Sequence, residues 1–125
     1  MIIPTHPNNT DFLSVPVLDL EKALSRVHHK KDLLKRVIDI FIQGLSEKTD
    51  LIEKEIKNQN WESLGILAHS LKGSSWTIGA QQLGDIAFAM EKASEKKDMI
   101  FFHHLFQIFK ESVHRFLEHG QNLKL

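Results

Sequence analysis

The sequence predicts an all-α protein, folded as an antiparallel up-down four-helix bundle with a short extra N-terminal helix. All three prolines lie within the first sixteen residues, and residues 17–125 contain none. A proline-free stretch of this length is typical of long helices, because proline breaks a helix interior. The sequence also lacks alternating apolar and polar runs and Asn-Gly or Asp-Gly turns, the usual signals of strands and hairpins. Short connections between long helices favour antiparallel neighbours.

Length and composition indicate a single domain of ordinary character. The chain has 125 residues, which is enough to bury one core. We expect the bundle to span residues 17–120, between an N-terminal arm of residues 1–16 and a tail of residues 121–125. Sixteen basic and sixteen acidic residues give a net charge of zero, which argues against nonspecific binding to nucleic acid or to a membrane surface. No cysteine is present, so disulfides, thiolate zinc sites and cysteine nucleophiles are excluded.

The first two helices are predicted by a capping residue and by apolar spacing. Asp19 can cap a short helix, because its side chain can accept a hydrogen bond from the first turn. A longer helix is expected over about residues 30–57, where apolar residues recur at steps of three and four with charge on the other side. Its apolar stripe consists of Leu34, Val37, Ile38, Phe41, Leu45, Ile52 and Ile56.

Asparagine, glycine and aspartate mark the ends of the remaining helices. Asn60 can cap the third helix, and Gly79 separates it from a fourth over residues 80–96. Asp98 opens a last helix, which Gly120 is expected to end. The expected inner residues of these last two helices are Leu83, Ile86, Ala87 and Met90, and then Leu105, Phe109, Val113, Phe116 and Leu117.

His69 lies in the third predicted helix, residues 61–78, and faces away from its buried side. On a helical wheel at 100° per residue, that buried side spans about 100° of arc. It consists of Leu64, Leu67, Ala68, Leu71, Ser75 and Ile78. His69 lies roughly 150° from the centre of this side, so its imidazole should point into solvent.

Glycines occupy two positions beside His69 on this outer face. Gly65 and Gly73 lie four residues before and after it, and each costs about 0.8–1 kcal/mol relative to alanine in a helix interior. The same face carries Ile66 and Trp76. An exposed imidazole between two glycines, with apolar side chains beside it, indicates a docking site for a bulky partner. The alternatives are that the glycines allow close helix packing and that Trp76 folds back over its own helix.

The segment AHSLKGSSWTIGA, followed by LGDIAFAMEKA, resembles the signature of histidine-containing phosphotransfer (HPt) domains. The family pattern is a histidine, two residues, Lys-Gly, two small residues, a Gly-Ala turn, a leucine and a glutamate-alanine pair. Upstream, VLDLEKALSRV, LLKRVIDIFI and NQNWESLGILAHS resemble the family's opening, second helix and loop. The likeness covers roughly residues 17–117. His28-His29 departs from it, because relatives often carry glycine between the first two helices.

The resemblance implies a function in a phosphorelay. His69 would carry a phosphoryl group between aspartates of response-regulator receiver domains, with a hybrid sensor kinase upstream. Such proteins have no autokinase activity, need no cofactor and bind no metal of their own, because the magnesium ion belongs to the receiver. We expect a cytoplasmic protein, since no apolar run approaches about 18 residues and no signal-peptide pattern is present. A monomer is the default expectation, and the sequence leaves the oligomeric state open. Met1 and the short arm favour a free-standing protein over the last domain of a hybrid kinase.

Three side chains would carry the chemistry. Imidazole, with an unperturbed pKa of about 6.5, is largely neutral near pH 7, and His69 could attack an aspartyl phosphate through Nε2. Lys72, one turn on, could place its ammonium against the phosphoryl oxygens, unless it is an ordinary solvated lysine. By resemblance, Glu91 on the next helix faces the histidine, where it could accept the Nδ1 proton and fix the tautomer. Alternatively, Glu91 is a solvated helix glutamate.

The other residues on the outer face of the third predicted helix would allow a receiver domain to approach and bind. Gly65 and Gly73 would give steric clearance, because a side chain at either position would stand in the way of in-line transfer. Ile66 and Trp76 would supply apolar contacts for receiver docking.

Two other functions are compatible with a helical bundle. A pure interaction module would bind a receiver or a kinase without phosphotransfer, and the presence of both His69 and Lys72 argues against it. A metal-dependent bundle enzyme would need inward-facing carboxylates in Glu-x-x-His spacing, and none is expected on the inner sides of the predicted helices. The adjacent pairs His28-His29 and His103-His104 would splay about 100° apart on a helix. They are predicted to be surface residues.

Overall fold

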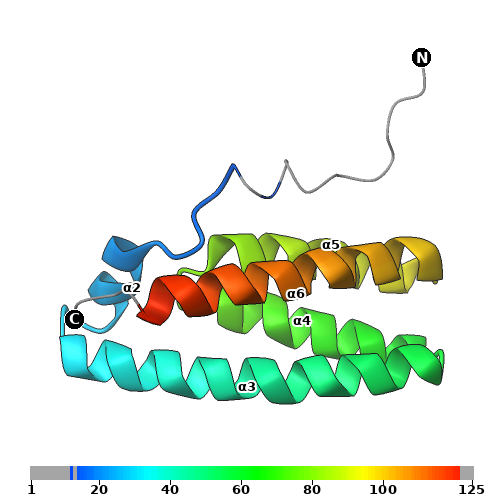
Figure 1. Ribbon diagram of the computed structural model, residues 1–125, viewed down its shortest axis with the longest axis horizontal. Helices are drawn as coiled ribbons and strands as arrows, with labels where there is room; N and C mark the ends of the chain where they lie inside the picture. The colour runs from blue at the N-terminus through cyan, green and yellow to red at the C-terminus, as the bar shows by residue number, and fades with distance from the viewer. Residues whose placement is uncertain (1–11, 13, 122–125) are drawn as a thin grey trace.

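The computed structural model describes residue 12 and residues 14–121, and this part of the chain forms helices and no strand. The helices are α2 (Leu20–Arg26), α3 (Lys31–Lys57), α4 (Trp61–Thr77), α5 (Gln81–Glu95) and α6 (Met99–Gln121). Four long helices lie side by side along the long axis, and α2 lies at one end (Figure 1). The predicted all-α bundle with a short extra N-terminal helix is confirmed. Residues 1–11, 13 and 122–125 of the expected arm and tail lie outside the described residues.

The predicted capping residues begin the helices as expected. The side chains of Asp19 and Asn60 accept hydrogen bonds from backbone N–H groups three residues on, at 3.1 and 3.2 Å. Asp98 accepts one at 3.0 Å. The predicted end of the last helix is wrong, since α6 continues through Gly120 to Gln121. Gly120 is not among the residues with positive φ, and glycine permits the left-handed conformation that ends a helix without imposing it.

The core lies between the inner sides of the four long helices. The predicted inner residues of α5 are all completely buried: Leu83, Ile86, Ala87 and Met90. Helix α6 adds four phenylalanines that are at most 1% exposed: Phe102, Phe106, Phe109 and Phe116. Five predicted stripe residues are half-buried: Val37, Ile56, Leu67, Val113 and Leu117. On the outer face of α4, Ile66 and His69 are exposed and take no part in this packing.

The turn between α4 and α5 is held by the segment that leads into α2. Gly79 in this turn has a φ of 84°, a left-handed conformation that favours glycine. A side chain there would also meet the Asp19 carbonyl oxygen at 2.8 Å, and the Asp19 N–H donates to the Gly79 carbonyl at 2.8 Å. The Arg26 guanidinium donates to the carbonyls of Trp76 and Thr77. Helix α2 and the residue before it therefore fix the C-terminal end of α4.

Replacing His29 with glycine is expected to stabilise the fold. His29 lies between α2 and α3 with a φ of 61°, and left-handed backbone costs a residue other than glycine about 1–2 kcal/mol. Allowing for the greater entropy that glycine loses on folding, His29→Gly should raise the free energy of unfolding by about 0.5–1 kcal/mol. Urea denaturation followed by circular dichroism measures this change. Lys30→Gly, at a φ of −83°, is the matched control and should lower stability, so equal shifts would contradict the argument.

Candidate functional site

His69 lies on the outer face of α4, as the helical wheel predicted. Its side chain is 67% exposed, whereas the opposite side of the helix is buried at Leu64, Ala68 and Leu71. The imidazole belongs to a rigid helix and is nevertheless accessible to another protein.

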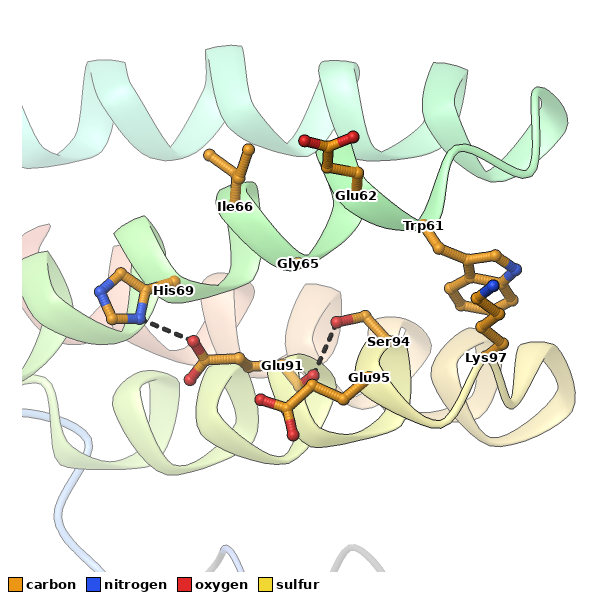
Figure 2. Close-up of a pocket in the computed structure, with 9 residues that line it drawn as sticks. All are labelled: Trp61, Glu62, Gly65, Ile66, His69, Glu91, Ser94, Glu95 and Lys97. Atoms are coloured by element: carbon orange, nitrogen blue, oxygen red, sulfur yellow. Dashed lines mark hydrogen bonds and ion pairs between the residues drawn. The ribbon is translucent and has the colours of Figure 1, made fainter.

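Glu91 on α5 contacts this imidazole directly. His69 Nδ1 lies 2.6 Å from Glu91 Oε2, and Figure 2 shows the second ring nitrogen on the side away from the carboxylate. A carboxylate can only accept a hydrogen bond, so Nδ1 carries the proton in this contact. In the neutral ring, Nε2 then holds the free lone pair. The structure thus brings together the two residues that the resemblance paired.

Lys72 completes this group by binding Glu91. Its Nζ donates to Glu91 Oε1 at 2.7 Å, and its side chain is only 18% exposed. The same Nζ lies 5.3 Å from the ring centre of Phe88 and 5.9 Å from that of Trp76. In the free protein, the Lys72 ammonium is therefore bound to the Glu91 carboxylate. The sequence had suggested that this ammonium would lie beside a phosphoryl group on His69.

The charges around Glu91 keep it ionised. Partial burial raises the pKa of this carboxyl, but the hydrogen bonds and charges of Lys72 and His69 outweigh burial and hold the pKa below its ordinary value of 4.5. Because the folded-state pKa is the lower one, the contribution of these contacts to stability is fully present above the ordinary pKa. It is lost as the pH falls through the lowered value.

The two glycines that flank His69 have different surroundings. Gly73 is exposed, and a Cβ added to it would meet nothing within 4 Å, so the space beside it is open as expected. A Cβ on Gly65 would lie 3.0 Å from Ser94 Oγ on α5. A side chain at position 65 would therefore crowd Ser94 on α5, although Gly65 also lines an open groove beside His69. Steric clearance at Gly65 stays a prediction. Close helix packing, the alternative noted for these glycines, applies to Gly65.

Ile66 and Trp76 also have different surroundings. Ile66 is 64% exposed and is available to a partner. Trp76 is half-buried, and its Nε1 donates to Asp85 Oδ1 at 3.0 Å. Its ring lies over Gly84, where an added Cβ would come within 2.8 Å of the indole Cγ. Trp76 thus packs on α5 and not over its own helix, and no pattern in the sequence indicated its contact with Gly84. Receiver docking by Trp76 stays a prediction.

An open groove of about 740 Å³ extends from His69 along the boundary of α4 and α5 (Figure 2). It is lined by Trp61, Glu62, Gly65, Ile66, His69, Glu91, Ser94, Glu95 and Lys97. The imidazole lies at one end of this groove, and Trp61 and Lys97 lie at the other end. A protein seated along the groove would reach the imidazole from outside the bundle.

Among residues 12 and 14–121, no group of three or more histidine, aspartate or glutamate side chains is placed to hold a metal ion. Glu111 and His114 have Glu-x-x-His spacing, but both are exposed on α6. The two adjacent histidine pairs are also exposed, as predicted. No helix in the described residues combines the length and the apolar character that crossing a membrane requires.

Residues 36–119 match the family model of the Hpt domain. This region is more than half of the chain and contains the whole of α4 and α5. The chain belongs to the HPt domain family. Within this HPt domain, the matched region includes His69, Lys72 and Glu91, and HPt domains take part in phosphorelays with kinases and response regulators.

Two solved structures share the architecture of this HPt domain. Histidine-containing phosphotransfer protein B from Pseudomonas aeruginosa is 19% identical, with a TM-score of 0.76 over 87% of this chain and 98% of that one. A rice protein, described as a candidate histidine-containing phosphotransfer protein, is 18% identical, with a TM-score of 0.67 over 90% of this chain and 88% of that one. At such identities the likeness establishes the fold. No curated protein sequence matches the chain significantly.

Proposed function

We propose that this HPt domain protein relays a phosphoryl group between aspartates of response-regulator receiver domains through a phosphohistidine at His69. The observation that carries the proposal is an imidazole 67% exposed on α4 whose Nδ1 is held by Glu91 at 2.6 Å. This contact leaves Nε2 as the nucleophile, on the accessible side of the ring. Membership in the HPt family supports the same assignment.

The transfer step needs nothing from this chain beyond the imidazole and its neighbours. The Nε2 lone pair attacks the phosphorus of an aspartyl phosphate, in line with the bond to the aspartate oxygen. An N–P bond forms as that P–O bond breaks, and the carboxylate leaves with the bonding electrons. Nδ1 keeps its proton, and the Glu91 carboxylate stabilises the positive charge that develops on the ring. The reverse step delivers the group to a second receiver.

Lys72 has two uses in this proposal. In the free protein it neutralises Glu91 and holds it in place through the 2.7 Å contact. Once the phosphoryl group is attached to His69, the flexible stem of Lys72 allows its ammonium to turn towards the new negative charge. We propose that the partners are receiver domains and a hybrid sensor kinase. The protein would act as a cytoplasmic monomer without autokinase activity and without a cofactor.

Phosphoryl transfer from a labelled receiver tests this function. A receiver carrying ³²P on its aspartate is incubated with the protein and Mg²⁺, and the reaction is followed by gel autoradiography. We expect a label on this chain that is lost in acid and retained in base, as a phosphohistidine should be. Absence of the label with every receiver of the source organism, or an acid-stable label, would refute the proposal.

Replacing Glu91 with glutamine should slow phosphoryl acceptance by about 10- to 100-fold, the usual cost of losing a residue that orients a histidine. The amide keeps the size of the side chain but cannot stabilise a cationic ring, and its NH₂ group would face Lys72 or Nδ1. Rapid-quench measurement of transfer from a phosphorylated receiver gives the rate. Glu118→Gln, at an exposed position of α6 outside the groove, is the matched control. Equal rates for the two variants would show that the contact with Nδ1 is dispensable.

A further inference from the structure

Helices α4 and α5 meet along one antiparallel seam that contains the proposed phosphorylation site. Gly65 faces Ser94, His69 contacts Glu91, and Trp76 lies over Gly84. In this series the residue numbers increase along α4 and decrease along α5, as they do between antiparallel helices. The contact between His69 and Glu91 therefore lies between two glycine contacts, one contributed by each helix.

The first glycine contact, between Gly65 and Ser94, is close, and a hydrogen bond holds the Ser94 hydroxyl in place. A Cβ on Gly65 would lie 3.0 Å from Ser94 Oγ and 3.9 Å from Ser94 Cβ. Ser94 is buried, and its hydroxyl donates to the backbone carbonyl of Glu91 at 2.6 Å. Turning this hydroxyl away would break that hydrogen bond. A methyl group at position 65 would therefore push on the turn of α5 that carries Glu91.

The second glycine contact is closer still. The indole of Trp76 overlaps the space that a Cβ on Gly84 would occupy. Its ring is held by the hydrogen bond from Nε1 to Asp85, and Gln81 Nε2 donates to the same carboxylate oxygen at 2.9 Å. An indole fixed in this way cannot yield to a methyl group without moving α4 or α5.

We propose that Gly65 and Gly84 are positioning residues, which set the separation of α4 and α5 so that Glu91 holds Nδ1 of His69. The inference rests on the proposed function. The contact it explains is 2.6 Å long, and a charge-assisted hydrogen bond of this kind is already weak beyond about 3.2 Å. A separation greater by about 0.6 Å would take the contact beyond this limit and release the imidazole to either tautomer. The glycines at positions 65 and 73 thus have different tasks, since a Cβ added to Gly73 would meet nothing within 4 Å.

The decisive measurement is the tautomer of His69 in the free protein, read from the ¹⁵N chemical shifts of its two ring nitrogens above the pH at which the ring is charged. We expect the Nδ1–H form to dominate in the wild type and in Gly73→Ala. Gly65→Ala should lower its population and slow phosphoryl acceptance by about tenfold. Adding Ser94→Ala removes the hydroxyl at 3.0 Å and should restore the tautomer. A folded Gly65→Ala protein with the wild-type tautomer, or no recovery in Gly65→Ala/Ser94→Ala, would overturn the inference.

The other end of the seam is tested with Gly84→Ala and Gly84→Ala/Trp76→Ala, the second of which removes the overlapping ring. The Nδ1–H population should fall in the first protein and recover in the second. If Gly84→Ala does not fold, a folded double variant with the Nδ1–H form supports the inference, and one without it counts against it. The tautomer is measured without any receiver. Failure of the inference can thus be told apart from failure of the proposed function. If the proposed function fails, the wild-type protein accepts no ³²P label from a receiver.

Discussion

Replacing His69 with glutamine is expected to abolish phosphoryl acceptance. The amide nitrogen of glutamine has no available lone pair for attack on phosphorus, so the nucleophile is lost outright. The fold should be retained, because the side chain is 67% exposed and exposed substitutions usually change stability by less than about 0.5 kcal/mol. Glutamine can also donate a hydrogen bond to Glu91 in place of Nδ1. The measurement is ³²P transfer from a phosphorylated receiver, with thermal denaturation to verify folding.

His104→Gln is the control for this experiment, since it makes the same change at an exposed histidine of α6. It should accept phosphate as the wild type does. Persistent labelling of His69→Gln would move the site elsewhere. Undiminished signalling in cells by an unlabelled His69→Gln protein would instead favour the alternative function, an interaction module that binds a receiver or kinase without phosphotransfer.

Leucine in place of Gly73 should separate stability from activity. A side chain at this position meets nothing within 4 Å in the free protein, and leucine is a better helix former than glycine by up to about 1 kcal/mol. The free energy of unfolding should therefore rise. Transfer should nevertheless fall by about 100-fold, because the new side chain stands one turn from His69, and a small misplacement of the reacting groups can cost this much.

Two variants make the result for Gly73 specific. Gly73→Ala should give at least the same gain in stability, because alanine is the best helix former. It should cause only a minor loss of transfer, because a methyl group projects less than an isobutyl group. Gly120→Leu, at a helical glycine of α6 with open space around it, should leave transfer unchanged. If Gly73→Leu accepted phosphate at the wild-type rate, open space beside the imidazole would not be a requirement of the reaction.

Patterns within one helix predicted most of the fold and the direction of His69. Apolar spacing and capping residues are local properties, so Asp19, Asn60 and the buried side of α5 follow from the sequence. The error at Gly120 has a local cause as well, since a glycine can remain helical when the chain around it does. The exposure of Ile66 was also predictable from the helical wheel.

Contacts between helices were less accessible to sequence reasoning. The pairing of Glu91 with His69 was implied by the family resemblance and could not have come from periodicity. The register between α4 and α5 decides that Lys72 binds Glu91 and that Trp76 lies over Gly84. No pattern inside either helix fixes this register, because it depends on how two surfaces fit together. For the same reason, Gly65 looked like free space for a partner and proved to face Ser94.

The two indole groups of this chain lie on either side of His69 along α4. No tyrosine is present, so the ultraviolet fluorescence of the protein comes from Trp61 and Trp76. The first stands edge-on to Phe102, with ring centres 6.1 Å apart, and lines the groove. The second is held against α5. Variants that keep one tryptophan would therefore give separate fluorescence signals. The signal of Trp61 should respond to a partner that binds in the groove, and that of Trp76 to movement between α4 and α5.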